Sequence, residues 1–146
     1  MSYKGLFTPR HPSKYKGDPS NIIYRSLWEK RLMSYLDVHK DVIKWASEEF
    51  SILYISPIDG KVHRYFPDFW IKQRNRTTGA IEVRVVEIKP AKQTKPPTIQ
   101  TRRTKKYINE VVAWGINEAK WKAATDYCNK RGWIFSIMTE KELGIK

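Results

Sequence analysis

The chain has 146 residues, the usual size of a single domain, and 40% of them are hydrophobic, which is enough to build a core and excludes disorder throughout. Its 28 Lys and Arg residues outnumber 15 Asp and Glu residues, so the formal net charge is +13. This balance favours a polyanionic partner, because each phosphate that a protein neutralises releases a condensed counterion, although a surface that only keeps the protein soluble is the alternative.

Cysteine content and hydropathy exclude further classes of protein. Cys128 is the single cysteine, which excludes an intrachain disulfide and a Cys-rich zinc site. It lies in a helical pattern and is expected to be a small buried filler. No apolar run approaches about 18 residues, and the N-terminus lacks a signal-peptide pattern. We therefore expect a soluble protein made for a reducing compartment.

The first elements in chain order are a basic arm and a helix. Residues 1–17 contain four cations, two prolines, two glycines and no acid, which predicts an extended arm in front of a main domain at residues 18–146. Asp18, Pro19 and Ser20 are typical of a helix start, and the pattern that follows predicts a helix to about Asp37.

Glu29 lies inside the apolar arc of this predicted helix. The arc consists of Ile22, Trp28, Leu32, Met33 and Leu36. A carboxylate that points towards a core is costly unless an ionic partner or a metal ion compensates it. The two interpretations are a salt bridge to Arg25, one turn earlier, and a metal site.

Strands and further helices follow. Strand patterns cover about residues 45–54, 62–72 and 80–89, with turns at residues 57–60 and 75–79. Pro67 interrupts the second strand near its start. A basic loop at residues 90–97 leads to two predicted helices, residues 98–115 and 117–132, and to a short strand at residues 133–138. Thr139 and Glu142 resemble a capping box of a final turn. This order predicts an α/β fold in a single domain.

Three side chains on the predicted strands suit phosphodiester hydrolysis. Asp68 follows Pro67, which interrupts pairing and leaves the next side chain free to point outwards. Glu87 and Lys89 are two residues apart and therefore share one face of a strand, while the carbonyl of Ile88 between them is available as a ligand. A hairpin connection can bring Asp68 near Glu87. Two carboxylates suffice for Mg²⁺, which keeps several waters, and a lysine can orient water or stabilise negative charge.

Each of these features alone has a simpler explanation. Glu-Ile-Lys near a strand end is usually a solvated ion pair, and Pro-Asp commonly opens a turn. Their joint occurrence, with Glu29 upstream, favours the catalytic interpretation. His11, His39 and His63 are too scattered for a zinc site, which disfavours a nuclease built on a catalytic histidine. A Gly-rich phosphate loop is missing, so ATP use is not indicated.

Two short strings resemble the PD-(D/E)XK nuclease superfamily. They are YFPDF at residues 65–69 and VEIKP at residues 86–90. The resemblance implies a restriction-endonuclease-like domain, a mixed central sheet flanked by helices with the core order αβββαβ. RSLWE at residues 25–29 resembles the TnsA-like subgroup, in which a glutamate on the first helix joins the metal site. Residues 3–5, 21–26, 107–110 and 120–121 resemble the head completion nucleases of T-even-like tailed phages.

The resemblance implies a role for each site residue. Asp68 and Glu87, with the carbonyl of Ile88, would bind Mg²⁺, for which Mn²⁺ can substitute. Lys89 would position the water or stabilise the transition state, and Glu29 would be a metal ligand or an organiser of the site. Glu49 is an accessory candidate, although a solvated edge shared with Glu48 explains it equally well.

A basic segment follows the predicted catalytic strand. Residues 92–106 contain no acid and six cations, which are Lys92, Lys95, Arg102, Arg103, Lys105 and Lys106. In a helix, Arg102, Lys105, Lys106 and Asn109 share one face, with Ile108, Val111 and Val112 on the core side. We expect this segment to hold the DNA backbone without reading bases. The alternative is a solvated helix face.

The residues thus predict a metal-dependent DNA endonuclease. The phage resemblance implies that it acts on double-stranded DNA after packaging, in the host cell cytoplasm during virion assembly or in the virion, with portal or neck proteins as candidate partners and no membrane. One rival is a transposon, restriction or repair endonuclease of the same fold. The other is a non-catalytic structural protein of the head or neck that binds DNA or the portal, which has no need of Asp68, Glu87 and Lys89.

Overall fold

A four-stranded mixed sheet forms the centre of the molecule. The structure, a computed structural model, describes residues 4–144; the first three residues of the predicted arm and the last two of the chain lie outside that part. The sheet order is β3 (Val42–Ser47), β6 (Phe69–Arg74), β7 (Ile81–Ile88) and β8 (Ile134–Met138). The first three strands are antiparallel, and β8 pairs with β7 in parallel. The fold is therefore mixed α/β, as predicted.

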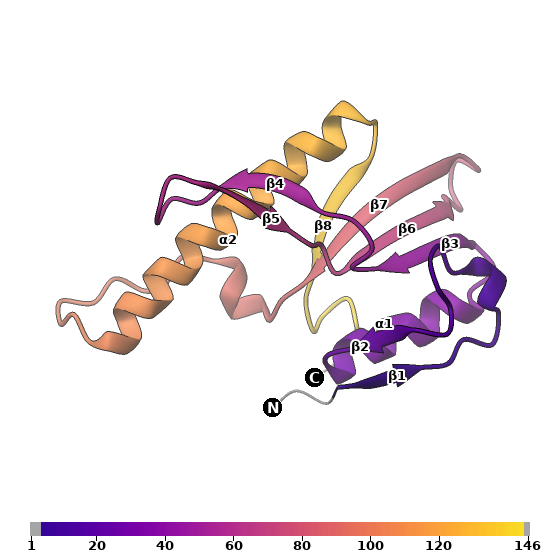
Figure 1. Cartoon of the computed structure of the whole chain (residues 1–146), viewed down its shortest axis with the longest axis horizontal. Helices are drawn as coiled ribbons and strands as arrows, with labels where there is room; N and C mark the ends of the chain where they lie inside the picture. The colour runs from indigo at the N-terminus through magenta and orange to yellow at the C-terminus, as the bar shows by residue number, and fades with distance from the viewer. Residues whose placement is uncertain (1–3, 145–146) are drawn as a thin grey trace.

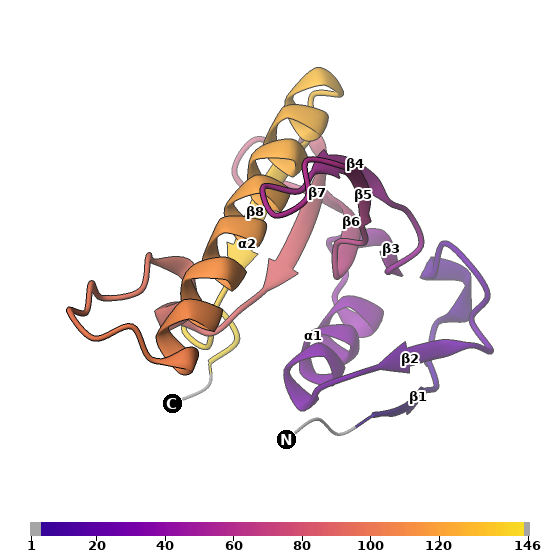
Figure 2. The same cartoon turned by 60° about the vertical axis from the view of Figure 1, so that its left-hand side comes forward.

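Two helices cover the two faces of this sheet (Figures 1 and 2). Side chains alternate between the faces along each strand. Val86 packs in the same cluster as Leu36 of α1 (Leu27–Val38), whereas Val85 packs with Cys128 of α2 (Lys105–Lys130). Glu87 has the parity of Val85 and therefore belongs to the face that α2 covers.

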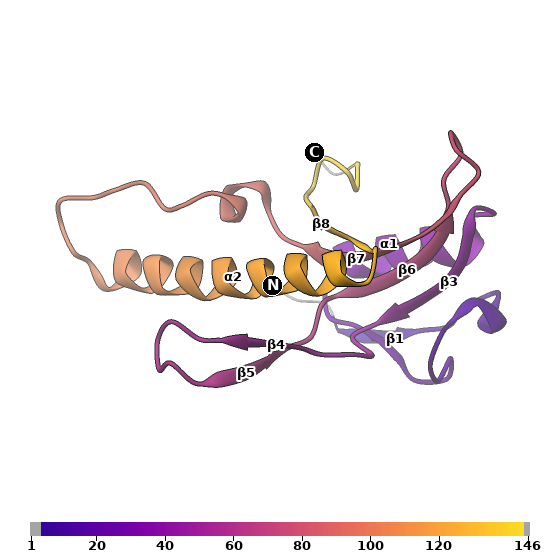
Figure 3. The same ribbon diagram turned by 90° about the horizontal axis from the view of Figure 1, so that it is seen from above.

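A separate hairpin lies beside α2. It consists of β4 (Ile52–Ile55) and β5 (Val62–Tyr65), which pair only with each other and pack on Trp121 and Ala124. Figure 3 shows this hairpin on one side of α2 and the segment before the helix on the other. The two strands predicted at residues 45–54 and 62–72 are each divided. Glu48 has a positive φ of 53° and ends β3, and Pro67 separates β5 from β6.

The N-terminal segment packs against the core through two aromatic side chains, so the prediction of an unpacked arm does not hold for residues 4–17. There β1 (Gly5–Phe7) pairs with β2 (Ile22–Tyr24), and a 3-10 turn spans Pro12–Lys14. Phe7 and Tyr15 are buried, and both rings meet Trp45 edge-on. The burial of these two aromatic rings offsets the conformational entropy that is lost when this basic segment becomes ordered.

The first helix begins eight residues later than predicted. Ile22–Tyr24 is strand, and the N-cap is Ser26, whose hydroxyl accepts a hydrogen bond from Glu29 N at 3.1 Å. Asp18 instead caps a local turn, where its carboxylate accepts hydrogen bonds from Ser20. Pairing of Ile22–Tyr24 with β1 outweighs the helix-start signal at Asp18.

The two helices predicted at residues 98–115 and 117–132 are one helix, α2. It begins after Thr104, whose hydroxyl accepts from Tyr107 N, and residues 98–104 are not helical. Gly115 is inside it, because one glycine costs a helix only about 1 kcal/mol. The N-terminal half of α2 projects beyond the sheet (Figures 1 and 3), so Ile108, Val111 and Val112 are exposed, contrary to the predicted core side. No helix in the described range is long and apolar enough to cross a membrane.

The final turn agrees with its prediction. Thr139 N donates to Glu142 Oε2 at 2.8 Å, and the hydroxyl of Thr139 donates to the same oxygen. Cys128 is fully buried, as expected for a filler, and burial raises the pKa of its thiol to about 11. This thiol is therefore no nucleophile.

Candidate active site

Asp68 and Glu87 meet at the adjacent ends of β6 and β7. Phe69 pairs with Val86, so Asp68 stands opposite Glu87 at the next position. One carboxylate oxygen of Asp68 accepts a hydrogen bond from Ile88 N at 2.8 Å. The proximity expected from the hairpin connection is therefore present, and the bond to the neighbouring strand fixes the Asp68 carboxylate.

Each carboxylate oxygen of Glu87 has a defined neighbour. Glu87 is only 7% exposed, and the hydroxyl of Tyr65 donates to its Oε1 at 2.6 Å. Its Oε2 lies 3.8 Å from Lys89 Nζ, as expected for residues two apart on one strand. Asp68, Glu87 and Lys89 together are called the carboxylate site below.

Burial makes the two carboxylates costly to ionise together. Desolvation, then the negative charge of Glu87, raises the pKa of Asp68 to about 8. Desolvation also raises the pKa of Glu87, against the hydrogen bond from Tyr65 and the charges of Lys89 and Lys120. Two carboxylates in this state gain from a cation that lets both ionise.

Glu29 adds a third negative charge from α1. Desolvation raises the pKa of Glu29, and its charge raises the pKa of both Asp68 and Glu87. Its Oε2 accepts from the hydroxyl of Ser26 at 3.3 Å, and its Oε1 is buried without a hydrogen-bond partner in the described chain. Arg25, the ionic partner considered for Glu29, forms its ion pair with Glu48 instead.

The donor set fits an open site for a hard cation better than a closed cage. Residues 4–144 contain no cluster of three or more His, Cys, Asp or Glu side chains placed to hold a metal ion. Two carboxylates of raised pKa and the unpartnered oxygen of Glu29 nevertheless are groups that could serve as oxygen ligands. Mg²⁺ suits such a site, because it retains several waters and needs only one or two carboxylates.

Two other candidates have different environments. Glu49 follows β3, is exposed, and accepts a hydrogen bond from the hydroxyl of Tyr15 at 2.7 Å. It therefore holds the N-terminal segment in place. His63 lies on β5, is exposed, and pairs with Asp59. Neither residue makes a hydrogen bond to Asp68 or Glu87 within the described structure.

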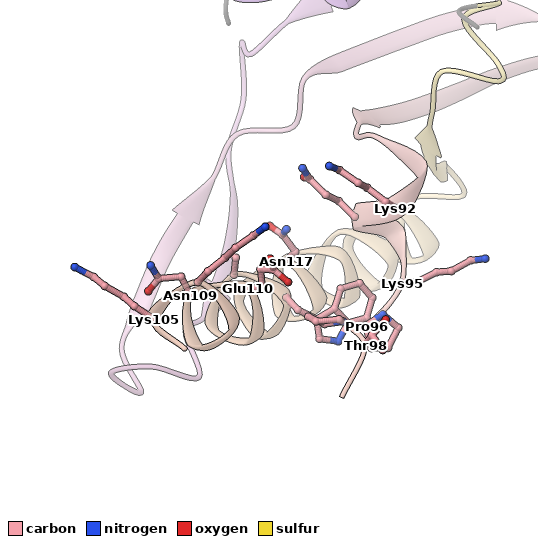
Figure 4. A pocket seen from close by; sticks show the side chains of 13 residues that line it. Lys92, Lys95, Pro96, Thr98, Lys105, Asn109, Glu110 and Asn117 are labelled. Carbon is pink, nitrogen blue, oxygen red and sulfur yellow. The ribbon is translucent and has the colours of Figure 1, made fainter. Parts of the chain in front are cut away.

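Four of the six predicted DNA-binding cations surround one pocket. The pocket, of about 820 Å³, lies between the segment after β7 and the N-terminal half of α2 (Figure 4). We call it the lysine pocket, after Lys92, Lys95, Lys105 and Lys106, which line it. Asn109 and Asn117 also line it, and Glu110 is its one acid. Arg102 and Arg103 are exposed but lie outside its lining.

Two residues beside the site had no predicted role. Tyr65 belongs to the motif string, but its bond to Glu87 depends on β5 leaving the main sheet, which no sequence pattern indicated. Lys120 comes from α2, and its Nζ lies 5.6 Å from the centre of the Tyr65 ring. Only the packing of α2 on the hairpin brings Lys120 to this place.

Two kinds of known protein are similar to this chain. The family model described as TnsA-like endonuclease N terminal matches residues 39–140, a range that contains Asp68, Glu87 and Lys89. The chain is also similar to the head completion nuclease of Enterobacteria phage T4. The two are 40% identical over 153 residues, which cover 100% of this chain and 99% of that protein.

Proposed function

The chain belongs to the TnsA-like endonuclease family, and from this premise we propose that it is a metal-dependent endodeoxyribonuclease that acts in phage head completion. The observation that carries the proposal is the carboxylate site, where Asp68 and Glu87 lie on adjacent strand ends beside Lys89. Buried carboxylates of raised pKa beside a lysine are costly for stability and suit catalysis.

The core of the fold is proposed to be α1, β3, β6, β7, α2 and β8, in the order αβββαβ. The β4–β5 hairpin is then an insertion between the first two core strands. This assignment is supported by the position of Asp68 and Glu87 at the ends of the second and third core strands.

We propose Mg²⁺ as the cofactor, with Mn²⁺ as a substitute. Asp68, Glu87 and the carbonyl of Ile88 would hold it, with Glu29 as a further ligand or an organiser of its waters. When bound, the ion activates water and compensates negative charge on the phosphate. Support comes from the raised pKa of each of the three carboxyl groups and from the buried, unpartnered oxygen of Glu29.

The protein groups would fix the geometry around this ion. The backbone N–H of Ile88 holds Asp68, and the hydroxyl of Tyr65 holds Glu87, so both carboxylates are oriented before DNA binds. Lys89, 3.8 Å from Glu87, orients the attacking water or stabilises the charge that develops on the phosphate.

Double-stranded DNA is the proposed substrate, and its backbone would be held by the exposed cations of residues 92–106. The protein would act in the infected host cell, since its relative is a phage head completion nuclease. Portal and neck proteins are the partners that we propose from the phage resemblance. A purely structural role is a weaker candidate, since it leaves the buried carboxylate pair without a purpose.

Incubation of the purified chain with supercoiled plasmid tests the activity. We expect nicked and linear products with Mg²⁺ or Mn²⁺ and none with EDTA. DNA binding without cleavage in either metal would contradict the proposal and favour the structural role.

A further inference from the structure

Lys120 reaches the carboxylate site from α2. Its Nζ lies 5.6 Å from the ring centre of Tyr65 and 5.8 Å from that of Tyr54. The hydroxyl of the same Tyr65 donates to Glu87. The ammonium group therefore approaches the site from α2, whereas Lys89 comes from the residue that directly follows β7.

This ammonium group forms no salt bridge among residues 4–144, although its charge lowers the pKa of Glu87. Lys120 is half-buried and forms no ion pair within 4.0 Å of a described carboxylate. Both ring distances are close to the limit of about 6 Å at which a cation–π contact still contributes, so the rings compensate only part of its lost hydration. An anion that enters the site would complete its environment.

The helix connects Lys120 to the lysine pocket. Asn109, Ala113 and Asn117 line the pocket at intervals of four residues, and hence on one face of α2. Lys120 follows Asn117 by three residues on this face. Figure 4 shows Asn109 and Asn117 along the helix, opposite Lys92 and Lys95. A strand of DNA held in the pocket would meet Lys120 as it reaches the carboxylate site.

We propose that Lys120 binds a phosphate of the DNA strand at the carboxylate site, as a second cation in addition to Lys89. The inference rests on the proposed nuclease function and deepens it, since it assigns a phosphate-binding residue to α2. An ammonium group at this place positions the phosphate and stabilises the negative charge that grows on it during hydrolysis.

Lys120→Met tests the inference, because methionine keeps an unbranched apolar stem on the two rings and removes the charge. Lys122→Met is the matched control, since Lys122 is exposed and points away from Lys120 on the same helix. With Mg²⁺ and saturating DNA, we expect Lys120→Met to lower kcat by about 10- to 100-fold at unchanged Tm. Lys120→Arg should recover most of the loss, and Lys122→Met should lose nothing.

Binding without cleavage gives a second readout. In EDTA, the slope of log Kd against log[salt] should decrease by about 1 for Lys120→Met and remain unchanged for Lys122→Met. If the wild type fails to cut DNA but the slope for Lys120→Met is lower than that of the wild type, the nuclease proposal fails and the phosphate contact of Lys120 stands. If the wild type cuts, while Lys120→Met matches Lys122→Met in kcat and slope, the inference on Lys120 is overturned.

Discussion

The hydroxyl of Tyr65 donates a 2.6 Å hydrogen bond to Oε1 of Glu87, which ties the β4–β5 hairpin to the carboxylate site. The bond favours the ionised carboxylate and works against the burial that raises the pKa of Glu87. The hairpin thus favours the ionised form of Glu87, which is the form that binds a cation.

Tyr65→Phe should remove the hydrogen bond to Glu87 while keeping the aromatic ring. The pKa of Glu87 rises further when the hydrogen bond is lost, so protons compete better with the metal ion. We expect half-maximal cleavage to require about 5- to 20-fold more Mg²⁺ at pH 7, with less difference at pH 9. Titration of Mg²⁺ in a nicking assay measures this. Tyr54→Phe, which loses no hydrogen bond to a described residue, is the control; an equal shift in both variants contradicts the prediction.

Asp68→Asn should stabilise the metal-free protein at alkaline pH. The folded-state pKa of Asp68 is about 8, above its ordinary value of 3.8, so the group costs no stability below about pH 4, and its destabilisation grows as pH rises from about 4 to about 8. Asparagine does not ionise. In EDTA we expect a Tm gain of about 3–6 °C at pH 9 and almost none at pH 4, measured by thermal denaturation. Asp126→Asn, a change at an exposed position, is the control and should show no such trend. The same Tm gain at both pH values for Asp68→Asn would contradict the prediction.

Glu29→Gln separates a metal-site role from helix capping. The amide side chain retains the shape, and the N-cap bond from Glu29 N to Ser26 is untouched. Oε1 of Glu29 is buried without a partner in the described chain, so a change at this atom breaks no hydrogen bond. We therefore expect no loss of Tm. Cleavage at limiting Mg²⁺ should decrease by about 10-fold and recover at high Mg²⁺, as is typical of a supporting ligand. Equal rates at all Mg²⁺ concentrations would show that Glu29 only caps α1.

Lys105→Gln with Lys106→Gln should weaken DNA binding without slowing the chemical step. Both side chains line the lysine pocket, away from Asp68 and Glu87. The slope of log Kd against log[salt] should decrease by about 2, and kcat at saturating DNA should stay within about 2-fold. A Lys40→Gln, Lys72→Gln variant, changed at the opposite end of the sheet, controls for net charge. If both double variants change the slope equally, the pocket is not the binding surface.

The pairing at the carboxylate site could be predicted because it depends on short-range rules. Asp68 and Glu87 lie on strands joined by a tight turn, and the period of two places Glu87 and Lys89 on one face. The helix start at Ser26 also follows a short-range rule, since Ser26 and Glu29 have capping-box spacing, but Asp18, Pro19 and Ser20 form a competing start signal upstream.

Other features depend on packing between distant segments. Whether Ile108, Val111 and Val112 are buried depends on how far α2 extends past the sheet, which their helical spacing does not encode. Likewise, the division of the predicted strands depends on the break at Glu48 and on the packing of the hairpin against Trp121. The contacts of Tyr65 and Lys120 follow from the same packing, so periodicity could not reveal them.

The most direct test of the account is plasmid cleavage by Glu87→Gln and Asp68→Asn beside the wild type, with DNA binding measured on the same preparations. Both substitutions keep the shape of the side chain and remove an ionisable carboxyl group from the carboxylate site. The account predicts Mg²⁺-dependent cleavage by the wild type, a loss of at least about 100-fold in each variant, and DNA affinity in EDTA that is unchanged or higher. Cleavage by both folded variants at the wild-type rate would contradict it and place the reaction elsewhere on the molecule.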